Sequence, residues 1–221
     1  MKILVLNCGS SSIKYKMFEM TTKEVIAQGG IEKIGLPGSF LKFTLPSGEK
    51  KQIDQDIPEH TVGVELIFQT LVNPEYGAIK SLDELDAVGH RVLHGGQAFS
   101  ESVLIDEKVI DAIVANCELG PLHNPANLKR MYAVQKILPN LPQVAVFDTA
   151  FHQSMPKENY MYATPYSWYT DYNVRKYGFH GTSHKYITNL MKEKLERDDI
   201  NLIVCHVGSG ASLSCIKNGQ C

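Results

Sequence analysis

Apolar and polar residues alternate along the first quarter of the chain with the two-residue period of β-strands. The stretch LVLNCGSSSIKYKMF keeps this alternation on both sides of a short interruption by cysteine, glycine and serine. Two alternating runs with such an interruption predict two strands joined by a polar corner. A later polar stretch rich in turn residues predicts a further hairpin. The elements expected here are strands at residues 2–7, 12–18 and 24–28, the corner at 8–11, a stop at Gly29-Gly30 and the hairpin within 36–57.

Helical spacing replaces the alternation beyond this region. One apolar set is spaced as on one face of a helix. Three later apolar runs each meet polar residues or glycine, which indicates strands that end at a surface. The helix set is Val64, Ile67, Phe68 and Leu71, and the later strands lie within residues 87–96, 143–151 and 201–221.

Two further segments begin with the start signals of helices. Residues 124–138 begin with Asn124, which can cap a helix, and Pro125, which suits its first turn. Residues 182–196 begin with threonine and serine and have one apolar face, which we expect to pack on the core. That face is formed by Ile187, Leu190, Met191 and Leu195.

The order of these elements predicts an α/β fold, because strands are followed by alternating helices and strands. LIVCHVGSGASLS near the C-terminus also resembles LVLNCGSSSIK near the N-terminus, since both have a strand, a Gly-Ser corner and a returning strand. This internal similarity predicts two similar domains, with a boundary near residue 150. Asn218-Gly219 is a strong hairpin-turn signal with only two residues after it, so we expect a longer natural protein.

Composition excludes several classes of function. The net charge of −2 gives no basic surface of the kind that nucleic acids select. No apolar run approaches the ~20 residues that span a bilayer, and the N-terminus does not match a signal peptide, so we expect no membrane association. The five cysteines form no C-x-x-C pair, which disfavours a zinc site and indicates reduced thiols in a cytoplasm.

The corner at residues 8–11 suits an oxygen-rich anion such as phosphate. Glycine and serine let backbone N–H groups approach a ligand, and hydroxyl groups add donors. Lys14 lies two residues beyond Ser12 on the same strand face and can bring a positive charge toward the corner. The alternative is a plain tight turn with a solvated lysine. The chain has no P-loop, dinucleotide fingerprint or G-x-S-x-G motif.

Histidines next to helix starts favour the anion-site alternative. His123 and His180 each directly precede an expected helix, whose first N–H groups and dipole attract anions. Either histidine alone is more often a packed side chain. Arg91, which can bind an anion with a bidentate fork, and Asp148 at a strand tip add to the pattern. The histidines expected to be merely packed are His60, His152 and His184.

Six motifs in the order LVLNCGSSSIKYKMF, GHRVLHGG, PLHNPAN, FDTAFH, YGFHGTSHKY and CHVGSGASLS resemble the acetate kinases of the acetokinase family. The resemblance covers essentially the whole chain. It implies an actin-like, ribonuclease H-like fold of the sugar kinase/Hsp70/actin type, with a mixed sheet flanked by helices. Residues 1–150 would then be the N-terminal domain, and residues 151–221 would be the incomplete start of a second, nucleotide-binding domain.

The resemblance also implies an activity. Members transfer the γ-phosphoryl group of ATP reversibly to acetate, with Mg²⁺ or Mn²⁺, and are cytoplasmic homodimers. We expect these 221 residues alone to be inactive. A kinase for propionate or another short-chain acid stays open, as does a non-catalytic actin-like nucleotide-binding module.

Roles carried over by motif cover both halves of the chain. The residues implied in catalysis are Arg91, His123, Asp148 and His180, and those implied around the acetate are Arg91, Leu93, Leu122 and Phe179. The residues implied at the nucleotide phosphates are Ser10, Ser12, Lys14, His206, Val207, Gly208, Ser209 and Gly210, and Asn7 is implied at the metal.

Two positions depart from the family pattern. Ser209 stands where asparagine is common, and its shorter side chain puts one phosphate contact in doubt. Leu93 stands where a smaller β-branched residue is common, which favours acetate over propionate because one methylene is worth about 1–3 kcal/mol. Acetate is already ionised at neutral pH, so we expect Asp148 to orient other groups rather than remove a proton, and we expect direct in-line transfer.

Overall fold

The computed structural model describes residues 1–45 and 47–221, and its chain forms two compact units. The first unit contains Met1–Val92 and Val103–Ala145, and the second contains Leu93–Ser102 and Val146–Cys221. The chain therefore leaves the first unit twice. The division into domains at residue 150 remains a prediction.

An eight-stranded mixed sheet forms the first unit, in the order β5-β4-β3-β2-β1-β6-β8-β7. Strands β1 to β5 pair antiparallel in chain order, and β1 also pairs in parallel with β6. The last two residues of β8 belong to the second unit. The strands are β1 (Lys2–Cys8), β2 (Ile13–Glu19), β3 (Glu24–Glu32), β4 (Phe40–Thr44), β5 (Lys50–Asp54), β6 (Ala87–Val92), β7 (Val103–Leu104) and β8 (Gln143–Phe147).

The first two strands and the hairpin within residues 36–57 lie where the sequence pattern predicts them. The third strand was predicted too short, because Gly29 and Gly30 lie inside β3 rather than at its end. A Cβ atom at Gly29 would lie 2.5 Å from the backbone oxygen of Lys42 and 2.7 Å from the ring of Tyr15. Glycine is therefore needed here for close packing within a strand, a role that looks like a turn signal in the sequence.

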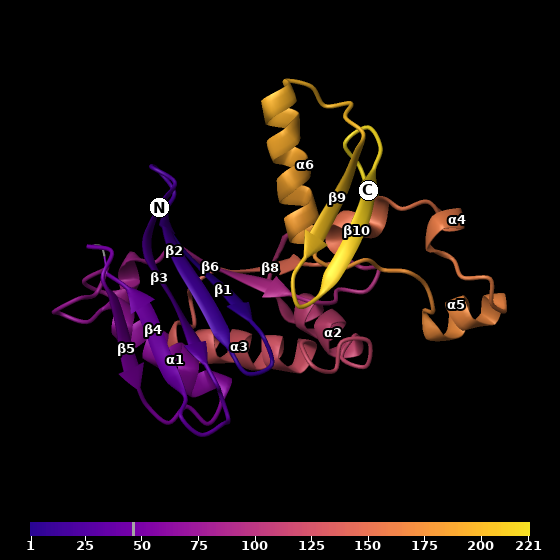
Figure 1. The fold of residues 1–221 in the computed structure, drawn as a ribbon. Helices are drawn as coiled ribbons and strands as arrows, with labels where there is room; N and C mark the ends of the chain where they lie inside the picture. Colours follow the sequence, from indigo (N-terminus) through magenta and orange to yellow (C-terminus); the bar gives the residue numbers. More distant parts are fainter. Residues whose placement is uncertain (46) are drawn as a thin grey trace. The chain divides into compact units, whose positions relative to one another are not determined.

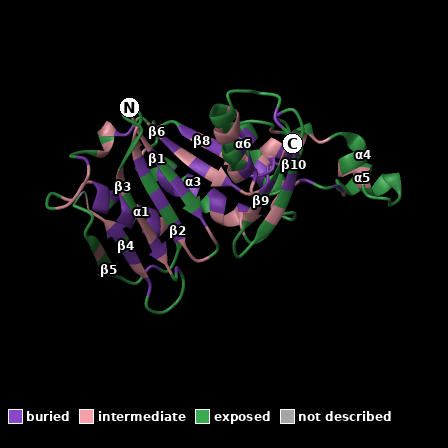
Figure 2. Cartoon of the chain, turned by 45° about the horizontal axis from the view of Figure 1, so that its top comes forward, coloured by how far each residue is buried: buried purple, intermediate pink, exposed green. Residues whose placement is uncertain are grey.

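Helices pack on one face of this sheet (Figure 1). The helical elements of the first unit are α1 (His60–Leu71), a 3₁₀ turn η1 (Leu82–Glu84), α2 (Glu107–Ala115) and α3 (Asn124–Ile137). The predicted apolar face of α1 is confirmed, since all four of its residues are buried. Buried and exposed residues alternate along β1 and β2, so one sheet face joins this core and the other stays open (Figure 2).

The predicted cap of α3 is wrong. The cap position is His123, which makes no side-chain capping bond, and the helix begins at Asn124. Asn124 is fully buried, and its Nδ2 donates to the carbonyls of Ile113 at 3.1 Å and Asn116 at 3.4 Å. Its amide therefore satisfies the end of α2, a helix that the sequence reading did not predict. Pro125 lies in the first turn, as predicted.

The second unit contains a two-stranded antiparallel sheet of β9 and β10 beside α6 (Figure 1). The predicted turn after β10 is confirmed, because Asn218 and Gly219 have φ values of 51° and 73°. The strand expected within residues 143–151, with its end at Asp148, ends one residue earlier at Phe147 and is followed by a 3₁₀ turn. The elements of this unit are η2 (Ala150–Ser154), α4 (Lys157–Tyr160), α5 (Tyr166–Tyr172), α6 (Gly181–Leu195), β9 (Leu202–Val207) and β10 (Ala211–Ile216).

The buried face of α6 differs from the predicted one. Ile187 and Leu195 are 37% and 49% exposed. The buried residues of α6 are Gly181, His184 and Thr188, and the helix packs against β9 and η2. The helix thus buries small and polar side chains, so its apolar stripe does not mark the packed face in this unit.

Helix length and the state of the cysteines bear on two expectations drawn from composition. Among the described residues, no helix is long and apolar enough to cross a membrane. All five cysteines lie in the described part of the chain, and none of them forms a disulfide.

Candidate functional site

The corner between β1 and β2 is a closed turn at the surface of the first unit. The backbone N–H of Gly9 donates to the carbonyl of Ser12 at 2.9 Å, while Ser10 is exposed. Beneath the corner, Nε2 of His60 lies 3.1 Å from the carbonyl oxygen of Gly9. Burial lowers the pKa of His60, so the neutral ring donates to this carbonyl and holds the corner from below. His60 is therefore packed, as expected.

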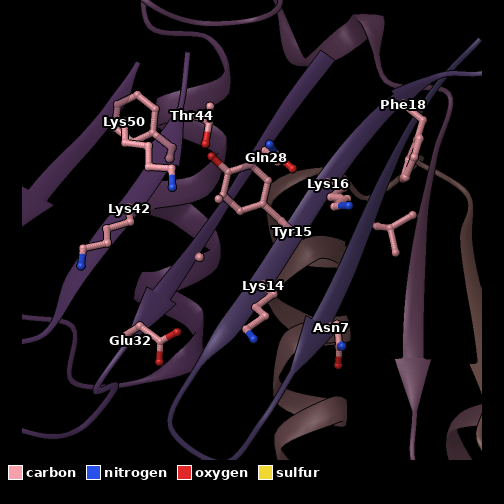
Figure 3. A pocket seen from close by; sticks show the side chains of 14 residues that line it. Asn7, Lys14, Tyr15, Lys16, Phe18, Gln28, Glu32, Lys42, Thr44 and Lys50 are labelled. Carbon is pink, nitrogen blue, oxygen red and sulfur yellow. The ribbon is translucent and has the colours of Figure 1, made fainter. Parts of the chain in front are cut away.

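Asn7 and Lys14 face each other across β1 and β2, next to the corner. They are direct register partners, and both side chains are exposed. With Glu32 they lie at one end of a groove of about 620 Å³ on the open sheet face, and Lys16 and Lys42 line the groove farther along (Figure 3). The excess of lysine over glutamate makes this groove attractive to a polyanion.

Arg91 is held at the end of β6 by contacts on two sides. Its Nη1 donates to Oδ1 of Asn7 at 3.1 Å, and its carbonyl accepts from Nη2 of the fully buried Arg130 at 2.8 Å. Nε of Arg130 donates to Nδ1 of His90 at 2.9 Å, and Nε2 of His90 lies 2.8 Å from Oε1 of Gln143. Burial, and then the charge of Arg130, keep the pKa of His90 well below its usual value, so His90 is neutral. A buried polar chain thus positions Arg91.

Leu122 and His123 precede α3 in the first unit. The side chain of Leu122 is 70% exposed, and His123 is half-buried at the cap position. Leu122 therefore lies at the surface of its own unit.

Asp148 and His180 are brought together in the second unit. Asp148 is fully buried, and its Oδ2 accepts from the backbone N–H of His180 at 3.2 Å. Its carbonyl oxygen accepts from the N–H of Gly181 at 3.0 Å. His180 has a left-handed backbone with φ of 56°, an uncommon conformation for a residue with a side chain. Asp148 therefore fixes the strained residue at the start of α6 through two separate bonds.

The ring of His180 belongs to a cluster of imidazoles. It stacks on His206 with ring centroids 4.2 Å apart, and its Nδ1 lies 2.8 Å from Oγ of Ser212. Nε2 of His184 lies 2.7 Å from the same oxygen. His184 was expected to be merely packed, and Ser212 was not singled out, yet Ser212 contacts the ring of His180 and His184 contacts Ser212.

The corner between β9 and β10 adjoins the ring of His180. The N–H of Gly208 donates to the carbonyl of Gly210 at 3.0 Å, and Val207 and Ser209 are exposed. A Cβ atom at Gly210 would lie 3.2 Å from Nε2 of His180. The second predicted phosphate corner and the predicted catalytic histidine are therefore direct neighbours.

Phe179 is positioned by two buried histidines of the second unit. Its carbonyl lies 3.0 Å from Nε2 of His152, and its ring meets the ring of His94 edge-on at 5.8 Å. Burial lowers the pKa of His94 to about 4, so His94 is neutral at pH 7. Leu93, which precedes His94, is half-buried in this unit.

A metal held by protein ligands alone does not fit the described residues. Among them, no group of three or more histidine, cysteine, aspartate or glutamate side chains is arranged to hold an ion. Asn7 offers one neutral oxygen, which already accepts from Arg91. Mg²⁺ often binds few protein oxygens together with substrate phosphates and water, and only such a shared site is compatible with Asn7.

Known proteins resemble this chain over its whole length. The sequence model of the acetokinase family matches residues 2–221. The acetate kinases of Phocaeicola vulgatus and Bacteroides thetaiotaomicron are each 66% identical over 223 residues, which covers 100% of this chain. That match covers 56% of each of them, so the chain spans about half the length of these curated relatives.

Solved structures of two enzymes superpose on the chain. Porphyromonas gingivalis acetate kinase matches with a TM-score of 0.93 and 54% identity, over 99% of this chain and 55% of the other. A propionate kinase from Francisella tularensis matches with a TM-score of 0.92 and 41% identity, over the same shares of the two chains.

Proposed function

Because the chain belongs to the acetokinase family and has its actin-like fold, we propose that it is the N-terminal part of an acetate kinase. The enzyme transfers the γ-phosphoryl group of ATP reversibly to the carboxylate of acetate. The observation that carries this proposal is the contact between a buried carboxylate, the left-handed His180 that it holds, and the glycine corner at 208–210.

The chemistry of phosphoryl transfer suits these residues. The reaction needs positioning and charge neutralisation more than covalent help. Arg91 offers a guanidinium that donates to Asn7 from a backbone held by Arg130, and its fork suits a carboxylate or the equatorial oxygens of a phosphoryl group. His180 and His123 offer imidazoles near the first turns of α6 and α3, where helix dipoles also favour negative charge.

Asp148 acts as an orienting group in this proposal. Acetate carries no proton to remove at neutral pH, because ordinary carboxylic acids have pKa values near ~4. The carboxylate instead accepts from the backbone of His180 and keeps that residue in its left-handed conformation.

Two Gly-Ser corners supply the phosphate contacts. The corner at 8–11 with Lys14 belongs to the first unit, and His206 to Gly210 form the corner of the second. Backbone N–H groups and serine hydroxyls bind phosphate oxygens at both corners. Ser209 keeps a hydroxyl at the exposed tip, with a shorter reach than asparagine.

A metal site in this chain would be shared with the nucleotide, with Asn7 as its protein ligand. We infer that Mg²⁺ or Mn²⁺ is bound mainly by phosphate oxygens and water, and that it neutralises phosphate charge when bound. Asn7 is the protein ligand that this chain contributes. Asn7→Asp should then tighten Mn²⁺ binding in the presence of ADP, measured by electron paramagnetic resonance of free Mn²⁺.

Formation of acetyl hydroxamate from acetate, ATP and hydroxylamine tests the proposal. A full-length protein containing these residues should form it, whereas the 221 residues alone should form little, because they span 56% of the related enzymes. Arg91→Ala in the full-length protein should lower kcat by roughly 10²–10³-fold while ADP still binds. ADP binding without hydroxamate, even before substitution, would favour a non-catalytic nucleotide-binding module.

Propionate is the alternative substrate, since a propionate kinase shares the fold of this chain at 41% identity. We propose acetate because Leu93 is bulky, and one additional methylene changes discrimination by roughly 10–200-fold. Leu93→Val in the full-length protein should raise kcat/KM for propionate relative to acetate. A wild-type preference for propionate would reverse this assignment.

Assembly and location complete the proposal. We infer a cytoplasmic homodimer for the full-length protein, and the absence of disulfides among the five cysteines is compatible with a reducing compartment. Light scattering coupled to gel filtration, and fractionation of the source cells, measure the two properties.

A further inference from the structure

The hydroxyl of Ser212 lies between two imidazoles that come from different turns of α6. Its oxygen is 2.8 Å from Nδ1 of His180 and 2.7 Å from Nε2 of His184. A hydroxyl has one proton to donate, and its lone pairs accept. In the described part of the chain the Ser212 hydroxyl has no other partner, so its proton goes to one of the two rings and its oxygen accepts from the other.

The burial of His184 decides the direction of this pair of bonds. His184 is fully buried, and its Nδ1 has no hydrogen-bond partner in the part of the chain that the structure describes. An orphaned buried N–H is rarer than an under-satisfied acceptor, so the proton of His184 sits on Nε2. Nε2–H of His184 then donates to Ser212, and the Ser212 hydroxyl donates to Nδ1 of His180.

The consequence for His180 is a fixed tautomer. Its Nδ1 accepts a bond, so its own proton is carried by Nε2. That nitrogen is the atom that a Cβ at Gly210 would approach to 3.2 Å, so it faces the glycine corner. We propose that Ser212 and His184 are positioning residues that hold His180 as an Nε2–H donor toward an anion at this corner. The inference rests on the proposed function, because it assumes that the corner receives phosphate.

The surroundings of His184 favour its neutral form. His206 stacks on His180, His152 lies with its ring centroid 5.6 Å from that of His184, and Asp148 contacts the His180 backbone. Burial, and then the neighbouring imidazoles, lower the pKa of His184 to about 4, whereas Asp148 opposes this shift. An additional N–H at Nδ1 of His180 would compete with the Ser212 hydroxyl proton, which would leave either that hydroxyl or Nδ1–H of His184 without a partner in the described part of the chain. The hydrogen-bond geometry therefore favours His180 with its proton on Nε2.

A purely structural tie between α6 and β10 is the competing explanation. Such a tie would affect the stability of the second unit but would not require one tautomer of His180. Ser183 in α6 supplies the matched control. Its hydroxyl also contacts an imidazole, because it lies 3.0 Å from Nδ1 of His206 in β9.

Carbon-13 NMR of the full-length protein separates the two explanations. With histidine labelled at Cδ2 and the His180 signal assigned through His180→Gln, wild type should show the Nε2–H tautomer. Ser212→Ala should give a mixture of tautomers, Ser212→Thr should restore one tautomer, and Ser183→Ala should leave His180 unchanged. The Nδ1–H tautomer in wild type, or an unchanged tautomer in a folded Ser212→Ala variant, would overturn the proposal.

Kinetics supply the second measurement. Ser212→Ala should lower kcat at least 10-fold, with KM for ATP changed less than 3-fold and the pH–rate profile shifted, and Ser212→Thr should recover most of the rate. An unchanged kcat and pH profile would overturn the positioning role. If wild type forms no acetyl hydroxamate although its His180 shows the Nε2–H tautomer, the proposed function fails while the hydrogen-bond assignment survives.

Discussion

At the scale of single residues, Asp148 shows how a buried carboxylate can act without transferring a proton. Its side chain and its carbonyl bond to the backbone of two consecutive residues at the start of α6. Both bonds need an acceptor, and neither needs a base.

This reading predicts different outcomes for two substitutions. Asp148→Asn keeps an acceptor oxygen for the N–H of His180, so the full-length enzyme should keep kcat within about 10-fold of wild type. Asp148→Ala removes the acceptor and should lose roughly 10²-fold or more, comparable with the loss of one preorganised contact. Steady-state hydroxamate assays measure both. Equal losses for the two variants would instead indicate that Asp148 acts through its charge or as a base.

Arg130 supports a second prediction at this scale. It lies fully buried in α3 and bonds through its guanidinium to His90 and to the carbonyl of Arg91. Arg130→Lys keeps the charge but cannot reproduce both bonds, which leaves a buried acceptor unsatisfied. The free energy of unfolding should fall by about 1–3 kcal/mol, measured by urea denaturation. Lys129→Arg, at the exposed neighbouring position, should change it by less than ~0.5 kcal/mol.

The residues that could be singled out from the sequence stand next to turn and helix-start signals. His123, His180 and the two corners adjoin proline or glycine, so their surroundings indicated a surface site. Arg130, His184 and Ser212 lie inside regular elements, where a polar residue is ordinarily read as a solvent-facing one. One signal was present for Arg130, because it is four residues before the buried Val134 on the packed side of α3.

At the scale of elements, the first two strands followed the two-residue alternation closely. Helix faces were harder to predict, as α6 shows. Its apolar stripe contains the exposed Ile187 and Leu195, while it packs through Gly181 and His184. Periodicity identifies an apolar side, but it does not tell which neighbour covers that side.

β3 gives a prediction that contrasts two glycines within strands. An alanine Cβ at Gly29 would lie 2.5 Å from the Lys42 backbone oxygen, whereas at Gly89 in β6 the nearest atom is a Val5 methyl at 3.8 Å. Gly29→Ala should therefore lower the free energy of unfolding by about 1–3 kcal/mol, because the strands must move apart. Gly89→Ala should be nearly neutral. Urea denaturation of the two variants side by side measures the difference, and equal effects would contradict the close-packing role of Gly29.

At the scale of the whole molecule, several histidines are held neutral in the folded chain. Burial is the main cause of the lowered pKa at each, and two of the values fall to about 4. The five residues are His60, His90, His94, His152 and His184. Fold-level features such as this pH response were not predictable from the sequence, because they depend on which histidines become buried.

The sign of the pH dependence follows from linkage. The unfolded chain binds protons at these histidines near pH 6.5, while the folded chain resists binding them down to about pH 4 at His94 and His184. Stability is therefore fully present above about pH 6.5 and falls as the pH drops toward 4. Thermal unfolding followed by circular dichroism across this range should show it. His94→Gln should lower by about one the number of protons taken up on unfolding, and so reduce the slope of stability against pH. An unchanged slope would contradict the assignment.

One of the two edge strands of the large sheet is β5, with the sequence KKQID. Its outward-facing N–H and C=O groups are a template on which a strand of another molecule can add. Lys50 and Lys51 on this strand disfavour the pairing of β5 with a second copy of itself, because that copy would bring two more positive charges close to them. The sheet can thus stay open at its margin in a crowded solution without growing into a ribbon of joined molecules.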